Sequence, residues 1–309
     1  MQMRMTFSTL NRVMHRLLLL PLVLLVAGCG AAASAGDRIT VVATTTQVAD
    51  LARNVGGTHV DVVQILAPNA DPHDYELRPH DVQAVADADV VLRSGGEVDA
   101  WIGDAIGGSG THAPVVDLSR GVVLHGDDPH WWQDPRDAMA ATGEIEAALA
   151  RADPAHADAY ARAAHAYTAR LRRLDGAVAG CLARVPAAAR KLVTTHDALG
   201  YYARRYGLEV IGAVIPSLST EAQASAGDTA SLIATIRRTG VKAIFAESSV
   251  NPKVEAAVAH ETGAKVGAAL WADTLGPVGS DGATYLESIA SNTDAVADGL
   301  SGGTVRCRL

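Results

Sequence analysis

The tripeptide Asp-Pro-His occurs twice in this sequence, first in Asp-Pro-His-Asp-Tyr-Glu (71–76) and again in Asp-Pro-His-Trp-Trp-Gln-Asp-Pro (128–135). In each copy the proline fixes its own φ and biases the aspartate before it towards an extended conformation. The histidine that follows is therefore held at a rigid, non-helical corner, where it is better placed to coordinate a ligand than to pack in a core. We predict that His73 and His130 meet across a cleft and share one metal ion.

Short β-rich runs alternate with helical patterns on both sides of these corners. In the first part of the chain we expect strands at 39–44, 60–66, 89–93 and 114–118. After Pro186 the alternation resumes, with strands expected at 191–195, 208–215, 242–246 and 264–270. This alternation predicts an α/β fold with two mostly parallel sheets, each covered by helices on both faces.

A long helical pattern lies between the two sets of strands. Apolar residues recur there at spacings of three and four, at Tyr160, Ala164, Tyr167, Leu171, Leu174 and Val178. A helix of about 25 residues would be roughly 35–40 Å long, which suits a stiff strut joining two lobes. The alternative is an ordinary core helix of one large domain. We predict a first lobe over 39–153, a linking helix over 154–186 and a second lobe over 187–309.

The first 28 residues have the features of an export signal. Arg4, Arg12 and Arg16 precede an apolar run over 17–27, which is too short to span a bilayer comfortably. The sequence Val-Ala-Gly-Cys (26–29) at its end resembles a bacterial lipobox, which would place a lipid anchor on Cys29. The alternative is an ordinary signal peptide that is cleaved nearby. We expect residues 29–38 to form a tether, and the protein to be held at the outer face of the cell membrane.

The charge of the chain restricts the kind of partner it can bind. The formal net charge is −8, and cleavage after residue 28 would remove three arginines and no acidic residues, which leaves −11 on a mature chain. A protein this acidic is a poor ligand for nucleic acid and for anionic lipid. We therefore expect no nucleic-acid partner and membrane attachment through the lipid alone. The protein is also expected to be a monomer.

Two cysteines remain once Cys29 is assigned to the anchor. Cys181 and Cys307 form an even pair in an exported, oxidising environment, so a structural disulfide is expected. Two free thiols are the alternative.

The second half of the chain offers further candidate metal ligands. His196, Glu247 and Asp273 each fall at or just beyond the C-terminal end of an expected strand. In open α/β sheets this edge is where ligands bind, and His73 and His130 likewise follow strands of the first lobe. Both lobes thus present ligand-forming side chains from the same kind of edge.

Four motifs in this order resemble a known family, the zinc- and manganese-specific solute-binding lipoproteins of bacterial ABC transporters. They are Asp-Pro-His-Asp-Tyr-Glu (71–76), Asp-Pro-His-Trp-Trp-Gln-Asp-Pro (128–135), Thr-His-Asp-Ala-Leu-Gly-Tyr (195–201) and Trp-Ala-Asp-Thr-Leu-Gly (271–276). The resemblance covers essentially all of the chain after the signal. It implies two α/β lobes joined by one long rigid helix, with a metal ion buried between them and an ABC permease as the partner.

Carried over position by position, the resemblance places the metal on His73, His130, His196 and Asp273. Three imidazoles and one carboxylate suit Zn²⁺, so zinc is the expected transported ion, with Mn²⁺ as the alternative. Glu247 and Asp197 are candidates for orienting a ligand from behind, and His125 is a candidate accessory ligand. For each of the three the alternative is an ordinary structural role, such as a helix cap at Asp197.

The sequence departs from the family pattern at three places. Leu77 and Arg78 stand where proline and a small residue are common, and Gln133 stands where an apolar residue is usual. Only His112 and His125 lie in the region where many zinc-binding members carry a long histidine-rich loop. This last departure argues against a metal-gathering loop and leaves the four-ligand site unaffected.

Other classes of function fit less well. A zinc hydrolase needs an open coordination position and a nearby base, and the sequence contains no His-Glu-x-x-His run, so we expect no enzymatic activity. A binding protein for an organic solute would need aromatic and amide side chains in its cleft rather than histidines. An adhesin-type surface lipoprotein is left open by the residues.

Overall fold

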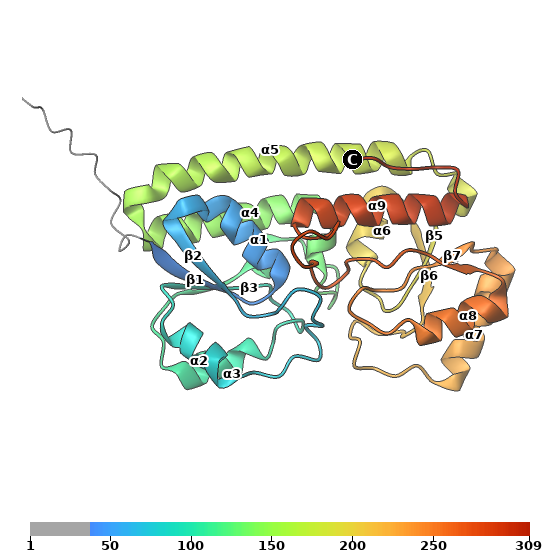
Figure 1. The fold of residues 1–309 in the computed structure, drawn as a ribbon, viewed down its shortest axis with the longest axis horizontal. Coiled ribbons are helices and arrows are strands. Elements are labelled where there is room, and N and C mark those ends of the chain that lie inside the picture. The colour runs from blue at the N-terminus through green and yellow to red at the C-terminus, as the bar shows by residue number, and fades with distance from the viewer. Residues whose placement is uncertain (1–37) are drawn as a thin grey trace, which may run out of the picture. The chain divides into compact units, whose positions relative to one another are not determined.

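The first lobe is built on a parallel sheet of four strands. In the computed structural model, which describes residues 38–309, the strand order is β2-β1-β3-β4 (Figure 1). The strands are β1 (Ile39–Ala43), β2 (Val60–Gln64), β3 (Val90–Arg93) and β4 (Val115–Asp117). Each lies within the run predicted for it.

Helices cover both faces of this sheet. Successive side chains of a strand point to opposite faces, and here both faces of the sheet carry buried apolar side chains. Val41 and Ala43 of β1 belong to the main core, beside α1 (Thr46–Gly56) and α4 (Pro135–Ala152). Val42 points to the other face and packs with residues of α2 (Pro79–Ala86) and α3 (Ile102–Ser109). The layered α/β arrangement predicted from the alternation is therefore confirmed for this lobe.

The second lobe has the same kind of architecture, but its sheet is broken into two short pairs. Strand β5 (Lys191–Thr194) pairs with β6 (Glu209–Ala213), and β7 (Ala243–Ile244) pairs with β8 (Lys265–Val266), all in parallel. Single bridges, Thr194 to Phe245 and Glu247 to Leu270, complete the layer. The helices around it are α6 (Gly200–Tyr206), α7 (Ala226–Thr239) and α8 (Lys253–Thr262). The strands expected at 242–246 and 264–270 are thus much shorter than predicted.

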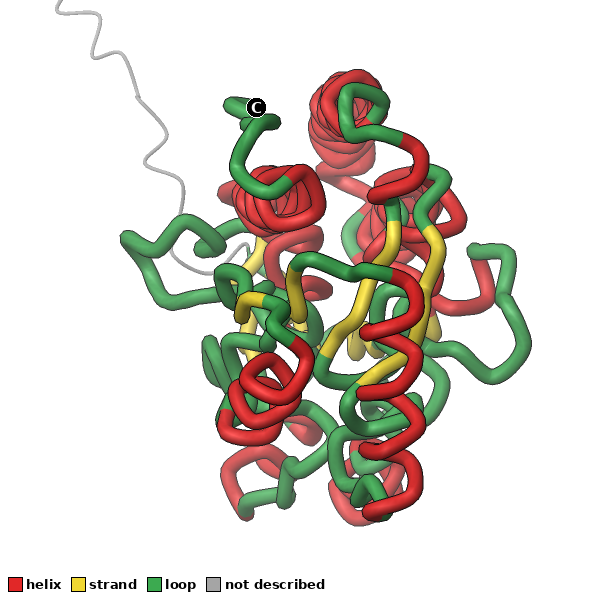
Figure 2. Tube along the Cα trace, turned by 90° about the vertical axis from the view of Figure 1, so that its right-hand side faces the viewer, coloured by secondary structure: helices red, strands yellow, loops and turns green. Residues whose placement is uncertain are grey.

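A layer of helices joins the two lobes on one side. The long helix α5 (Ala157–Leu182) packs on α4 in the first lobe and on α9 (Tyr285–Ser301) towards the second (Figure 1). Figure 2 shows these helices nearly end-on, on one side of the strands. Helix α5 has 26 residues and is therefore about 39 Å long. The linking helix predicted from the apolar stripe is present within 154–186, while the exact lobe boundaries stay predictions.

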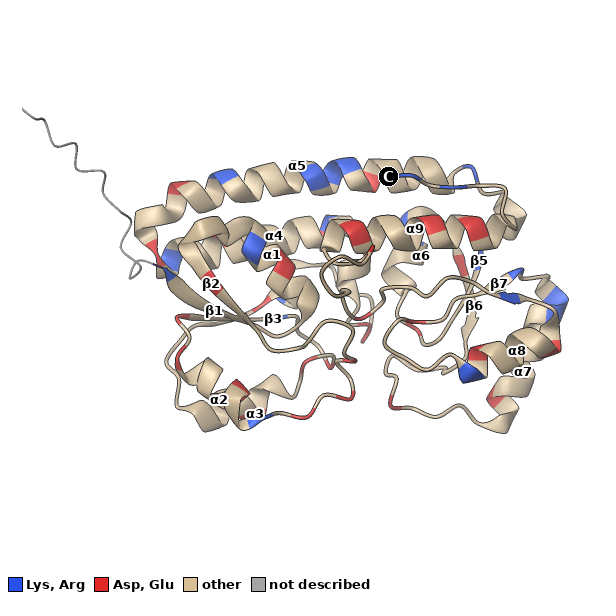
Figure 3. Ribbon diagram, viewed as in Figure 1, with Lys and Arg blue, Asp and Glu red and all other residues tan. Residues whose placement is uncertain are grey.

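The side chains of α5 follow the predicted stripe. Tyr160, Tyr167, Leu171 and Val178 are buried against the core. Figure 3 marks the basic residues along α5, together with a few acidic ones, and the acidic residues along α9. Helix α9 was not predicted from the sequence, and it covers the inner side of α5 in the second half of the molecule.

The predicted disulfide between Cys181 and Cys307 is present. It joins the last turn of α5 to the C-terminal segment after α9. The two cysteines are 126 positions apart in the sequence, and the chain-entropy model gives about 4–5 kcal/mol of stabilisation for a closed loop of that size.

Three predictions concern the start of the chain. The signal segment 1–28, the lipidation site Cys29 and nearly all of the tether 29–38 lie outside the described residues. Within 38–309, no helix combines the length and the apolar character needed to cross a bilayer.

Candidate metal centre

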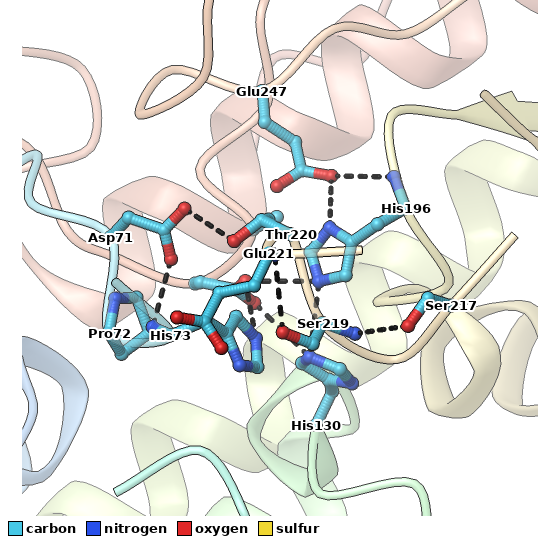
Figure 4. A network of polar contacts seen from close by, with 12 residues as sticks. Asp71, Pro72, His73, His130, His196, Ser217, Ser219, Thr220, Glu221 and Glu247 are labelled. Carbon is cyan, nitrogen blue, oxygen red and sulfur yellow. Dashed lines mark hydrogen bonds and ion pairs between the residues drawn. The ribbon is translucent and has the colours of Figure 1, made fainter. Parts of the chain in front are cut away.

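The two Asp-Pro-His corners adopt the same local structure. In the first, the backbone N–H of His73 donates to Asp71 Oδ1 at 2.9 Å, and in the second the N–H of His130 donates to Asp128 Oδ1 at 3.0 Å. Each aspartate thus closes a tight turn around the proline, which is a conformation that Asp favours in loops. Both histidine rings are directed from these turns into the region between the lobes (Figure 4).

The other two candidate ligands come from the second half of the chain. His196 stands two residues beyond β5, and Asp273 stands three residues beyond the bridge at Leu270. Both positions are at carboxyl ends of parallel strands or bridges, as predicted.

These four side chains form one cluster whose ligand atoms all lie within 4.8 Å of one another. Asp273 Oδ2 is 3.3 Å from His73 Nε2 and 3.1 Å from His196 Nε2, and Asp273 Oδ1 is 3.5 Å from His130 Nε2. The Nε2 atoms of His130 and His196 are 3.3 Å apart. A tetrahedron with metal–ligand distances of 2.0–2.1 Å has edges of about 3.3 Å, so these separations suit one ion bound at the centre.

The cluster is shielded from solvent. The side chains of His130, His196 and Asp273 have no exposed surface, and that of His73 is 4% exposed. Among the described residues, both oxygens of Asp273 and the Nε2 of His73 lack a hydrogen-bond partner. Buried polar atoms without partners are costly, and a bound cation would satisfy them together.

The electrostatics of the cluster favour a positive charge. Burial alone would lower the pKa of His196, but the neighbouring Asp273 carboxylate and the Glu247 carboxylate at Nδ1 raise that pKa to about 11. Burial would likewise raise the pKa of Asp273, yet the charges of His196 and His130 hold that pKa well below its usual range. A carboxylate is thus kept ionised among three imidazoles, in the place where a divalent cation would be bound.

Two of the imidazoles are oriented from behind by carboxylates. Glu247 Oε1 lies 2.6 Å from His196 Nδ1, and Asp128 Oδ1 lies 2.8 Å from His130 Nδ1. A hydrogen bond at Nδ1 fixes the tautomer that directs the Nε2 lone pair towards the metal. The Glu247 carboxylate therefore lies where an orienting partner of His196 would stand, and this role stays a prediction. The structure adds Asp128, which the sequence interpretation missed although the repeated tripeptide contains it.

The remaining candidates are placed differently. Asp197 donates its backbone N–H to Ser217 O at 2.9 Å, and burial raises the pKa of its carboxyl, but it is not one of the four clustered side chains. The ring of His125 packs on Tyr201, with 4.8 Å between ring centroids, and also lies outside the cluster. An accessory role for either residue stays a prediction.

The segment that carries Asp273, residues 271–275, is hydrogen-bonded to the first lobe on both sides of the ligand. On one side, Ala272 O accepts from Trp132 Nε1 at 2.8 Å and from Gln133 Nε2 at 2.7 Å. On the other, Leu275 N donates to Thr46 Oγ1 at 2.7 Å. Gln133, which departs from the family pattern, therefore helps to position the candidate ligand Asp273, more than a hundred residues away in the sequence.

Known proteins resemble this chain over most of its length. The model of the family described as "Zinc-uptake complex component A periplasmic" matches residues 41–299. The chain is 33% identical over 290 residues to the manganese-binding lipoprotein MntA of Bacillus subtilis (strain 168), which covers 88% of this chain and 94% of that protein. It is 31% identical over 272 residues to the iron-binding protein YfeA of Yersinia pestis, which covers 85% and 86% respectively.

A solved structure agrees in fold as well. The periplasmic zinc binding protein TroA from Treponema pallidum superposes with a TM-score of 0.79 at 28% identity, covering 85% of this chain and 99% of that one. The two-lobe fold, the His/Asp cluster and the match over 41–299 lead to one conclusion. The chain belongs to the zinc-uptake complex component A family, the metal-binding solute-binding proteins of ABC transporters, and is not an enzyme.

Proposed function

We propose that this protein captures one Zn²⁺ ion between its lobes, outside the cytoplasmic membrane, and delivers it to an ABC permease for import. The observation that carries this proposal is the buried cluster of three imidazole nitrogens and one carboxylate, with ligand atoms 3.1–3.5 Å apart in four pairs. This donor set and spacing match the tetrahedral nitrogen-rich coordination that zinc favours.

A filled coordination shell suits a carrier. Four protein ligands occupy all positions of a tetrahedral ion and leave none for an activated water, which catalytic zinc sites retain. The burial of all four side chains would also keep the ion from exchanging with solvent until the lobes separate.

Manganese is the second candidate, and two observations favour it. Several relatives of this chain are named manganese-binding proteins. In addition, both oxygens of Asp273 face imidazoles, so the carboxylate could bind in a bidentate manner and raise the coordination number, as a manganese ion would require.

The location of the protein is part of the proposal. We infer that the chain is exported and anchored through a lipid on Cys29, because the signal-like segment ends in Val-Ala-Gly-Cys and several relatives are named lipoproteins. Labelling of the protein with radioactive palmitate in cells, and loss of the label in Cys29→Ala, would test the anchor. A processed Cys29→Ala protein that keeps the label would contradict it.

The metal site is tested by titrating chelator-treated protein with Zn²⁺ and with Mn²⁺ in a calorimeter, and by competition between the two ions. We expect one tight site that prefers Zn²⁺, and its strong weakening in His73→Ala and in His196→Ala. His165→Ala, at an exposed position on α5, is the control and should bind as the wild type does. Wild-type affinity in both ligand variants would refute the assignment, and a preference for Mn²⁺ would replace zinc by the second candidate.

A further inference from the structure

Asp71 connects one metal ligand to the opposite lobe. Its Oδ1 accepts from the backbone N–H of His73 at 2.9 Å, and its Oδ2 accepts from the hydroxyl of Thr220 at 2.6 Å (Figure 4). Asp71 belongs to the first lobe, whereas Thr220 lies 149 residues further along the chain, in the loop between β6 and α7. A single carboxylate thus fixes the corner of His73 and bonds across the cleft at the same time.

The loop that carries Thr220, residues 216–225, has a defined conformation. Ser219 N donates to Ser217 Oγ at 3.1 Å, and Glu221 N donates to Ser219 Oγ at 3.3 Å, so successive serine hydroxyls fold the chain around Thr220. The base of the loop is attached beside another metal ligand, because Asp197 N donates to Ser217 O at 2.9 Å. Thr220 therefore moves with the part of the second lobe that holds His196.

His73 depends on this connection more than the other imidazoles do. His130 and His196 each have a carboxylate at Nδ1. Among residues 38–309, no Asp or Glu forms an ion pair with His73 Nδ1. The orientation of His73 is therefore set by its Asp-Pro-His corner, and the corner is set by Asp71.

We propose that Thr220 is a positioning residue for the metal ligand His73, acting across the cleft through Asp71. The inference rests on the proposed four-ligand site and adds a device that links its retention of metal to closure of the lobes. When the lobes are closed, the Thr220 hydroxyl holds the Asp71 carboxylate in the rotamer that fixes the corner of His73. When the second lobe moves away, the same displacement withdraws His196 and releases Asp71.

The surroundings of Asp71 suit such a release step. One side of Asp71 lines a cavity of about 660 Å³ that also contains Asp74, Glu76 and, from the second lobe, Ser249. Once Thr220 has left, water in this cavity can solvate the Asp71 carboxylate, and the His73 corner loses its fixed geometry. The ion would then lose His196 and a well-oriented His73 together.

The test compares the rates at which zinc leaves the protein. Zn²⁺-loaded wild type, Thr220→Val and Thr220→Ser are mixed with an excess of a chromogenic chelator, and the dissociation rate constant is measured by stopped flow. We expect Thr220→Val to release zinc about tenfold faster, because a hydrogen bond to a charged carboxylate is lost. Thr220→Ser restores the hydroxyl and should return the rate to within about twofold of the wild type.

A matched control separates this effect from a general loss of stability. Thr229→Val removes a hydroxyl of similar exposure in the same lobe, one that bonds only within its own helix end at Ser225 O, and should leave the rate unchanged. In the background of Asp71→Asn, the Thr220→Val substitution should add little, since both act through one contact. Equal dissociation rates in Thr220→Val and Thr229→Val, or no rescue by serine, would overturn the inference while leaving the one-site titration of the wild type intact. Failure of the wild type to bind zinc or manganese would instead overturn the proposed function and this inference with it.

Discussion

The four proposed metal ligands are divided unequally between two frameworks. His73 and His130 stand on corners of the first lobe, and Asp273 is fixed to the same lobe through the hydrogen bonds on both sides of it. His196 is oriented by Glu247, which belongs to the second lobe. By position in the sequence, each lobe contributes two of the four residues. By their hydrogen bonds, however, three of them are attached to the first lobe, and only His196 is attached to the second.

The two frameworks also differ in their sheets. Both lobes contribute buried residues to the core under the helical layer, for example Leu92 from the first and Phe245 from the second. The first lobe has a continuous sheet of four strands, whereas the second has two separate pairs with ladders as short as two residues. Because short ladders supply fewer backbone hydrogen bonds, we infer that release of the ion begins when the second lobe carries His196 away.

The largest expected effect concerns Asp273, which comes from the second half of the sequence but is attached to the first lobe. Asp273→Asn should weaken zinc binding by more than about 100-fold, which exceeds the effect typical of losing an orienting partner, because it removes the one anionic ligand. His196→Ala should cost less, since three ligands remain on one framework. Competition titrations with a chelator of known affinity measure both losses, and equal losses would break the proposed asymmetry.

The next effect concerns the carboxylate behind the fourth ligand. In Glu247→Gln the amide oxygen can still accept from His196 Nδ1, but the negative charge is lost. We expect zinc affinity to fall about 10-fold, at the lower end of the range for orienting partners. The thermal unfolding temperature of the metal-free protein is the second measurement, and a loss of fold without a separate loss of affinity would assign Glu247 a purely structural role.

The equivalent substitution in the first lobe should have a smaller effect. Asp128 orients His130 as Glu247 orients His196, but its side chain is 14% exposed against 2% for Glu247. Since water screens the more exposed charge, Asp128→Asn should weaken zinc binding by roughly two- to fivefold. The same chelator competition applies, and a loss larger than that of Glu247→Gln would reverse the order of the two supports.

Local patterns in the sequence predict the parts of this site that local chemistry determines. The Asp-Pro-His corners follow from the conformational limits of proline, and His196 and Asp273 follow from their places after β-rich runs. Contacts between distant segments, such as Thr220 with Asp71 or Gln133 with Ala272, have no such signature. They depend on how the lobes meet.

In the second lobe, some helices and strands themselves were not predicted correctly from the sequence. Helix α9 was missed although Thr284 and Glu287 form a capping box at its start and Gly302 ends it in a left-handed conformation. The sequence predicts a full strand over 264–270, yet Lys265 and Val266 are exposed and the run contains Gly267 and three alanines. Small residues in that segment provide few side chains to pack, so tertiary context shortens the strand.

The smallest expected effect tests the attachment of Asp273 to the first lobe. Gln133 is buried, and its Nε2 donates to Ala272 O, while its Oε1 has no partner among the described residues. Gln133→Leu removes one of the two donors to Ala272 O, which destabilises the fold, and it also removes the buried unpaired oxygen, which stabilises the fold. These two effects on the free energy of unfolding should nearly cancel, to within about 1 kcal/mol. Trp132 still bonds Ala272 O, and zinc affinity should fall by no more than about twofold. Thermal unfolding and chelator competition measure these values. A tenfold loss of affinity at unchanged stability would show that the amide of Gln133, rather than the pair of donors, holds Asp273 on the first lobe.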